Sequence, residues 1–159
     1  MKLHAILAFL LMLPAVCAAS DPTPSLRHVF DIHAKCAEAF TVGDTPQGKR
    51  VIIPITGGEV SGDVKGTIRS GGADYQLVDT VSGRTSLEAI YSFRTDDGAW
   101  IKVCNKGIFS HDGSGDYFMT APTFEAPQGT RYEWLNDRIF VCRPVGFTDG
   151  ITLRVWVVE

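Results

Sequence analysis

Asp74 is the first candidate for chemistry because of the residues on either side of it. It follows Gly71 and Gly72 and precedes the aromatic Tyr75. The two glycines allow the backbone to turn so that the carboxylate points into the mouth of a barrel, where it would act as a general acid or base. The alternative is a structural aspartate that caps a turn by accepting hydrogen bonds from nearby amides.

A second group of candidates lies in the segment YEWLN. Tyr132, Trp134 and Asn136 occupy alternate positions there, so they share one face if the segment is a strand. Two aromatic planes and an amide that both donates and accepts would suit an organic ligand. The competing interpretation is an aromatic core cluster, with Asn136 and Asp137 forming a hairpin turn.

Tyr91 and Asn105 are further ligand-binding candidates. Tyr91 lies in the middle of the strand-like segment LEAIYSFRT and could offer its hydroxyl to a ligand in a barrel lumen. A core tyrosine with its hydroxyl at the rim is an equally ordinary arrangement. Asn105 ends the next strand-like segment, and it is either a pocket residue or a turn residue.

The motifs of several other kinds of site are absent from the sequence. There is no CxxC, and His28, His33 and His111 do not fall in a metal-ligand pattern. The glycine-rich stretch lacks the GxxxxGK[ST] pattern of a phosphate loop, and no GxSxG marks a serine hydrolase. We therefore expect no metal and no cofactor.

The charge balance argues against nucleic acid as a partner. The chain has 15 basic and 18 acidic residues and a formal net charge of −3. The Lys and Arg residues are scattered, with no basic run and no interleaving of basic and aromatic residues. A small molecule is the expected partner.

The elements that would position these candidates are strands. The stretch from Gly57 to Tyr75 contains six glycines among short polar and β-branched residues, which is typical of tightly curved β-structure. Asp97 and Gly98 predict a tight hairpin turn. The segments with strand-like patterns are Leu26–Phe40, Lys49–Ile55, Val60–Arg69, Ser86–Thr95, Trp100–Asn105, Tyr117–Thr120, Thr123–Ala126, Thr130–Trp134, Arg138–Cys142 and Thr152–Val158.

So many strands with short loops between them predict an all-β fold, either an antiparallel barrel or a sandwich. We favour a single antiparallel β-barrel of about eight to ten strands. A strand at each end of the chain could pair to close the sheet, and the glycines supply the bends that closure needs. Residues 20–159 would form this one domain.

The first 19 residues have the pattern of a secretory signal peptide. A short basic start at Met1 and Lys2 is followed by an apolar run, Ala5–Leu13, and then by small residues up to Ala19. The apolar run is too short to span a bilayer, and no later stretch is long enough. We therefore expect a secreted protein, extracellular or periplasmic, with no stable membrane insertion.

Removal of the signal peptide leaves an odd number of cysteines. Cys36, Cys104 and Cys142 would remain in an oxidising compartment, where one disulfide bond and one free thiol is the simplest arrangement. Cys104 and Cys142 lie in strand-like segments and could bridge neighbouring strands, but the sequence does not say which pair forms. The alternative is three buried, small apolar residues.

Several short motifs are distributed over residues 71–136. They are Gly71-Gly72-Ala73-Asp74-Tyr75, Asp96-Asp97-Gly98-Ala99, Asn105-Lys106-Gly107, Tyr117-Phe118, Pro122-Thr123-Phe124-Glu125 and Tyr132-Glu133-Trp134-Leu135-Asn136. Together these motifs resemble the family of bacterial and fungal proteins called domain of unknown function 3237. The resemblance covers residues 57–158 and implies a small antiparallel β-barrel, but no settled activity. The signal peptide and the extra cysteines depart from the family pattern.

Two functional hypotheses follow. In the first, the barrel binds a small apolar or aromatic metabolite in its lumen. In the second, the protein is a cofactor-free cyclase, isomerase or lyase, in which Asp74 moves a proton while the cavity shapes the substrate. A third possibility is a structural barrel filled with side chains, which a lumen cavity would distinguish from the other two.

Overall fold

The computed structural model describes residues 23–159, so the predicted signal peptide lies outside the described residues. One short 3-10 helix, η1 (Glu133–Asp137), interrupts a chain of strands, and no helix in residues 23–159 is long and apolar enough to cross a bilayer. The strands are β1 (Leu26–Cys36), β2 (Phe40–Thr45), β3 (Gly48–Gly62), β4 (Gly66–Ile68), β5 (Gly72–Val78), β6 (Thr85–Thr95), β7 (Trp100–Asp112), β8 (Gly115–Glu125), β9 (Phe140–Phe147) and β10 (Gly150–Val158).

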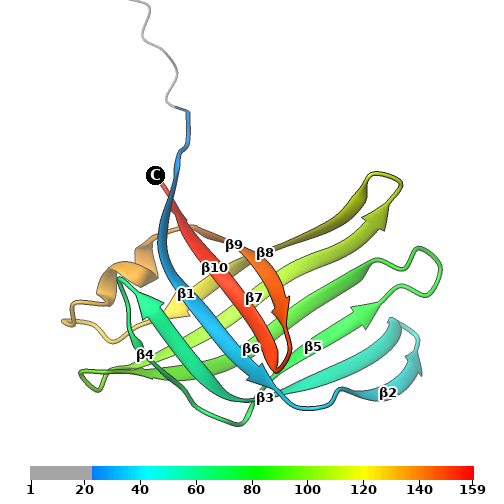
Figure 1. Cartoon of the computed structure of the whole chain (residues 1–159), viewed down its shortest axis with the longest axis horizontal. Coiled ribbons are helices and arrows are strands. Elements are labelled where there is room, and N and C mark those ends of the chain that lie inside the picture. The colour runs from blue at the N-terminus through cyan, green and yellow to red at the C-terminus, as the bar shows by residue number, and fades with distance from the viewer. Residues whose placement is uncertain (1–22) are drawn as a thin grey trace, which may run out of the picture.

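The strands close into an antiparallel barrel (Figure 1). The ring passes through eight strands in the order β1, β10, β9, β8, β7, β6, β5 and β3, and the pairing of β3 with β1 closes it. β2 and β4 are additional strands that pair with β3. The predicted closed barrel is confirmed, and so is the pairing of the two ends of the chain, because Leu26 at the start of β1 lies opposite Val158 at the end of β10.

One end of the barrel is filled by a packed core. Phe140 contacts Phe124 edge to face, with ring centroids 5.0 Å apart. The ring centroid of Trp134, on η1, lies 5.7 Å from that of Phe140. Leu135, also on η1, is completely buried, and Figure 1 shows η1 at this end of the barrel, away from the long hairpins. We call this part the closed end.

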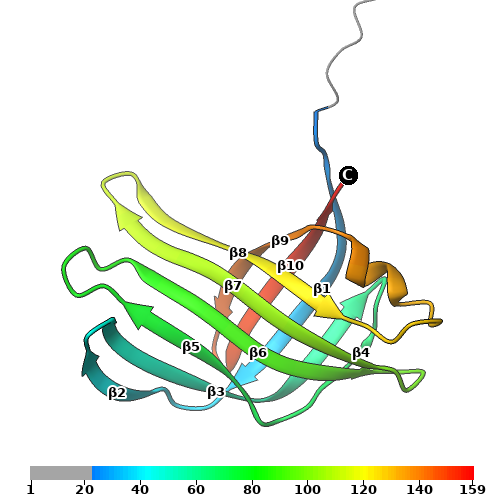
Figure 2. The same ribbon diagram turned by 180° about the vertical axis from the view of Figure 1, so that it is seen from behind.

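The opposite end of the barrel is built from long hairpins. The β5–β6 and β7–β8 hairpins extend beyond β9 and β10 (Figure 2). The register between β8 and β9 consists of the single pair Thr120–Cys142, so the first half of β8 is hydrogen-bonded to β7 alone. We call this part the open end.

Two of the predicted strands are one strand in the structure, because Pro122 between them does not interrupt it. The expected strands Tyr117–Thr120 and Thr123–Ala126 are parts of β8, which runs through Pro122. Proline cannot donate a backbone hydrogen bond and is tolerated at an unpaired strand edge. Beyond Thr120 the edge of β8 that faces β9 has no register partner, so the missing N–H does not interrupt a ladder.

The predicted strand Thr130–Trp134 was wrong, because this segment forms a turn and then η1. The hydroxyl of Thr130 donates to the carbonyl of Pro127, and the Glu133 carboxylate accepts a bond from the amide of Gly129. These local bonds satisfy the backbone in a turn instead of in a ladder. Tyr132, Trp134 and Asn136 therefore do not alternate along a strand.

The cysteines differ from the expected arrangement of one disulfide bond and one free thiol. Cys36, Cys104 and Cys142 are all unpaired in the described part of the chain. Cys104 on β7 and Cys142 on β9 are not on neighbouring strands, because β8 lies between them. Cys142 is buried inside the barrel, whereas Cys104 lies opposite Thr123 on the outer face.

Candidate functional site

The open end of the barrel encloses a cavity of about 450 Å³, a volume in the range of small-molecule sites. It is lumenal, because the residues that line it come from alternate, inward-facing positions of the strands, such as Leu87, Ala89 and Tyr91 of β6. Most of its wall is apolar. The aliphatic side chains in that wall are Ala34, Ala37, Ile53, Ile55, Leu87, Ala89, Ile151 and Leu153.

Three of the residues selected from the sequence meet in this cavity. Asp74 of β5 lies opposite Ala89 of β6, and Ala89 in turn lies opposite Asn105 of β7. Asp74 and Asn105 therefore flank a residue whose small side chain leaves space between them. Tyr91 lies two positions along β6 from Ala89, on the same inward face.

Four buried oxygen atoms in the cavity lack a hydrogen-bond partner. They are Asp74 Oδ1, Tyr91 Oη, Asn105 Oδ1 and Thr120 Oγ1, and all four residues line the cavity. Among residues 23–159, these are the buried side-chain nitrogen or oxygen atoms without a partner. The exposed fractions of Tyr91, Asn105 and Thr120 are only 4%, 4% and 6%. An unpaired buried polar atom costs about 1–3 kcal/mol, so four in one cavity require an explanation.

Burial controls the protonation of the two acidic groups in this set. The desolvation of Asp74 raises the pKa of its carboxyl, and the hydrogen bonds from the side chain of Gln76 and the backbone of Glu88 oppose this shift without cancelling it. The Gln76 amide donates to Asp74 Oδ2 over 2.8 Å, which leaves Oδ1 free. Burial also raises the pKa of Tyr91, so its hydroxyl keeps its proton.

Two glycines make space for the polar side chains of the cavity. A Cβ atom added at Gly72 would lie only 2.5 Å from the Cβ of Tyr91, and one added at Gly107 would collide with the side chain of Thr120. Gly71 has a φ of +109°, a conformation that favours glycine. The Gly71–Asp74 motif is thus explained by its fold, because it turns the chain into β5 and leaves room for Tyr91.

Acidic groups surround the cavity mouth. Glu38 and Asp149 contribute to the lining together with the thiol of Cys36, whose pKa is raised by burial and by the nearby carboxylates of Asp74 and Asp149. No Lys or Arg lines this cavity. Among residues 23–159, no group of three or more His, Cys, Asp and Glu side chains could hold a metal ion.

Residues 24–158 match the family described as "Protein of unknown function (DUF3237)". The chain belongs to this family. A UPF0311 protein of Bradyrhizobium diazoefficiens is 37% identical over 148 residues, which cover 84% of this chain and 96% of the relative.

Two solved structures share the DUF3237 barrel seen here. A conserved protein of unknown function from Rhodopseudomonas palustris is 35% identical, with a TM-score of 0.80 over 87% of this chain and 99% of its own. A β-barrel-like protein from Acinetobacter baumannii is 28% identical, with a TM-score of 0.81 over 89% of this chain and 99% of its own. These similarities support the barrel.

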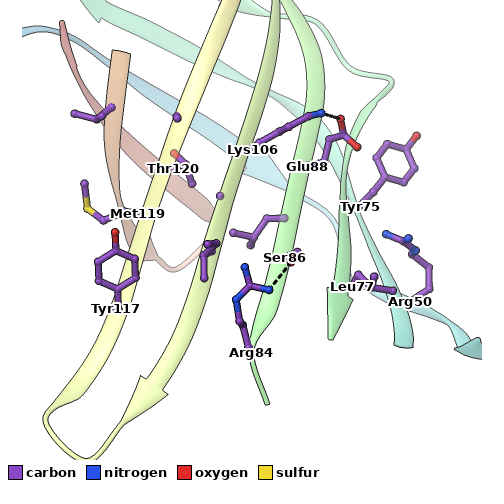
Figure 3. A pocket seen from close by; sticks show the side chains of 15 residues that line it. Arg50, Tyr75, Leu77, Arg84, Ser86, Glu88, Lys106, Tyr117, Met119 and Thr120 are labelled. Atoms are coloured by element: carbon purple, nitrogen blue, oxygen red, sulfur yellow. Dashed lines mark hydrogen bonds and ion pairs between the residues drawn. The ribbon is translucent and has the colours of Figure 1, made fainter. Parts of the chain in front are cut away.

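A second hollow lies on the outer face of this DUF3237 barrel, over β5 to β8 (Figure 3). It is larger, at about 670 Å³, but of the four buried, unpartnered oxygen atoms it shares only that of Thr120, which lines both spaces, and its other polar groups are paired or open to solvent. Lys106 forms a 3.1 Å ion pair with Glu88, and Arg84 donates to the hydroxyl of Ser86 over 3.3 Å. We therefore take the lumen cavity, where the unpartnered polar atoms are buried, as the candidate site.

The other three residues selected from the sequence lie at the closed end. The hydroxyl of Tyr132 donates to Asp97 Oδ1 over 2.8 Å, and Trp134 packs against Phe140. The side-chain amide of Asn136 donates to the carbonyl of Ala126 and accepts from its N–H. None of the three lines the cavity. The alternative interpretation as an aromatic core cluster describes Tyr132 and Trp134, whereas Asn136 is exposed and belongs to η1 instead of a hairpin turn.

Thr120 is the cavity residue that was not selected from the sequence. Threonine is common in strands, and no motif distinguishes Thr120 from the others. One signal was available, namely its alternation with Pro122 and Phe124, which assigns it to the inner face of β8 once Phe124 is placed in the core.

Proposed function

We propose that this protein binds a small apolar or aromatic molecule in the barrel lumen. One observation carries the proposal: four buried oxygen atoms without partners lie in a single cavity with an apolar wall. Filled structural barrels satisfy or exclude such groups, whereas binding sites keep a few polar groups ready for a ligand. A bound molecule would supply the missing hydrogen bonds.

The residues of the cavity have distinct roles in this proposal. The aliphatic wall removes the apolar body of the ligand from water. Asp74 and Asn105, on either side of Ala89, bind a polar group of the ligand from two neighbouring strands. The hydroxyls of Tyr91 and Thr120 complete the ring of polar contacts.

A second function, proton transfer by Asp74, is supported by one specific observation. Burial raises the pKa of this carboxyl, and one of its oxygen atoms is free to reach a ligand. A general acid or base works best when its pKa lies close to the operating pH. In a cofactor-free cyclase, isomerase or lyase, the cavity would hold the substrate in shape while Asp74 exchanges a proton with it.

Secretion is also part of the proposal. The pattern of residues 1–19 supports cleavage of a signal peptide before the barrel folds. Denaturing mass spectrometry of the protein recovered from its own host would measure the mass of the mature chain, and a chain that retains these residues would contradict secretion by this route.

Native mass spectrometry tests the binding proposal directly. The wild-type protein purified from its host should carry a small molecule that dissociates on denaturation. Ala89→Phe fills the space between Asp74 and Asn105, so this variant should carry none. Ala121→Phe is the matched control, because Ala121 lies on the outer face and lines only the outer hollow.

Loss of the ligand from the Ala121→Phe variant with retention in Ala89→Phe would move the site to the outer hollow. A wild-type protein that carries no ligand and binds none from a metabolite extract would contradict the proposal. Circular dichroism of both variants would establish that each is folded.

A further inference from the structure

All four unpartnered polar atoms in the cavity are oxygens. The carboxylate oxygen of Asp74 and the amide oxygen of Asn105 accept hydrogen bonds, and the hydroxyl oxygens of Tyr91 and Thr120 also have lone pairs that accept. A ligand that satisfies this set has to bring hydrogen atoms. A ligand that only accepts, such as a carboxylate or a phosphate, would leave Asp74 and Asn105 unpaired.

The charges around the cavity also favour a ligand that donates hydrogen bonds over an anionic one. Its lining contains three carboxylates, those of Glu38, Asp74 and Asp149, and neither Lys nor Arg. Asp74 Oδ1 is buried and has no cationic neighbour, and Tyr91 and Asn105, which face the same space, are each more than nine-tenths buried. Glu38 and Asp149 are exposed, so the like charge that a negatively charged ligand would meet in a region of low dielectric constant is that of Asp74.

We propose that the lumen ligand carries a protonated amine on its apolar or aromatic body, and that the ammonium group lies between Asp74 and Asn105. This inference rests on the proposed function and narrows it to a class of ligand. An ammonium group has three donors and no acceptor, which matches a ring of oxygen atoms. Its hydrogen bond to a carboxylate is charge-assisted and stronger than one from a neutral hydroxyl.

The surroundings of Asp74 predict how pH affects binding. The titratable groups that line the cavity with it are Cys36 from β1, Tyr91 from β6, Glu38 and Asp149, and Asp149 in turn lies 3.8 Å from the ring of His33 on β1. On its own strand the neighbour is the neutral amide of Gln76. An amine binds the ionised carboxylate, so amine affinity should fall as the pH decreases through the pKa of Asp74. A neutral alcohol also binds the protonated form and should not show this loss.

Three probes of matched size test the inference: phenethylamine, 2-phenylethanol and phenylacetate. Isothermal titration calorimetry at neutral pH should give a dissociation constant about tenfold lower for phenethylamine than for 2-phenylethanol, because a charge-assisted hydrogen bond is about twice as strong as a neutral one. Phenylacetate should bind most weakly.

Asp74→Asn should remove the preference for the amine, bringing phenethylamine and 2-phenylethanol to within about twofold of each other. Glu88→Gln is the matched control. Glu88 is on the neighbouring strand, but its side chain points outward and pairs with Lys106, so all three affinities should stay at their wild-type values.

The outcomes separate the two proposals. If 2-phenylethanol or phenylacetate binds as tightly as phenethylamine, the inference about the amine is overturned, and lumen binding stands. If none of the probes binds, lumen binding of small aromatic molecules fails as well. Should Asp74→Asn not fold, the pH dependence of phenethylamine affinity in the wild-type protein decides, measured beside the carboxyl resonance of Asp74 by NMR. An affinity that does not change through that titration overturns the inference.

Discussion

The closed end and the open end of the barrel both contain a buried tyrosine and an asparagine, but the side-chain oxygen atoms of these residues have hydrogen-bond partners only at the closed end. At the closed end, the Tyr132 hydroxyl donates to Asp97, and Asn136 makes two hydrogen bonds to the backbone of Ala126. At the open end, Tyr91 Oη and Asn105 Oδ1 are buried without a hydrogen-bond partner.

In the function proposed above, this difference separates residues that stabilise the fold from residues that bind the ligand. Tyr132 and Tyr91 are almost equally buried, at 3% and 4% exposed, so burial alone does not distinguish their roles. What distinguishes them is the partner. The Tyr132 hydroxyl, through its bond to Asp97, links η1 to the β6–β7 hairpin, whereas the Tyr91 hydroxyl has no partner and in the proposed function bonds to the ligand. The predictions that follow test this contrast.

The largest expected effect is at Phe140. Phe140→Ala should lower the free energy of unfolding by about 3–5 kcal/mol, because this side chain is completely buried against Phe124 and Trp134. The matched change Phe118→Ala removes a ring that borders the open cavity and should cost about 1–2 kcal/mol. Urea denaturation measures both. Equal losses would contradict the distinction between a packed end and an open one.

Gly72→Ala should cost about 1–3 kcal/mol, because the new Cβ would overlap the Cβ of Tyr91 and force the strands apart. Ala73→Ser is the control on the adjacent residue, which lies on the other face of β5. Thermal unfolding measures both variants. A Gly72→Ala protein as stable as wild type would show that Tyr91 does not need this space.

Tyr132→Phe should lower the free energy of unfolding by about 1 kcal/mol at neutral pH, since it removes a hydrogen bond to a carboxylate. Hydrogen bonds from Thr95 and Tyr132 hold the pKa of Asp97 below its ordinary value. A carboxyl whose pKa is lowered by folding stabilises the folded protein at pH values above its ordinary pKa. This stabilisation is lost as the pH falls through the lowered pKa of Asp97. The difference between variant and wild type should therefore shrink in acid, as measured by urea denaturation at several pH values.

Asp74→Asn should change the pH dependence of stability in the opposite sense. The pKa of the Asp74 carboxyl is raised in the folded protein. Its contribution to the free energy of unfolding is therefore fully present below the ordinary aspartate pKa and is lost as the pH rises through the raised pKa. The ligand-free wild-type protein should lose stability over this interval, and the variant should not. Melting temperatures recorded across the interval would give the two slopes, and identical slopes would contradict the prediction.

Tyr91→Phe should have the smallest effect on stability. Its hydroxyl has no partner, so removing it should leave the free energy of unfolding of the ligand-free protein unchanged or raise it by up to about 1 kcal/mol. Affinity for the lumen ligand should fall. A loss of stability equal to that of Tyr132→Phe would mean that the Tyr91 hydroxyl has a structural partner.

The barrel and part of the site could be predicted from the sequence because they depend on local patterns. Alternation and turn residues marked most of the strands, and the Asp97–Gly98 turn joins β6 to β7 as expected. The β5 strand, which carries Asp74, was not predicted, because the glycines before it favoured a corner. The segment around Tyr132 was misassigned for the reverse reason, since an alternating pattern hid a turn held by local hydrogen bonds.

The pattern of residues was enough to predict the all-β class and the closure of the sheet by its terminal strands, and to select Asp74, Tyr91 and Asn105 as candidates. Which polar residues have partners could be seen only in the folded barrel. Hydrogen-bond satisfaction depends on residues far apart in the chain, such as Tyr132 and Asp97, or on no residue at all, as at Tyr91. Strand register brings these groups together, and register is a property of the whole barrel.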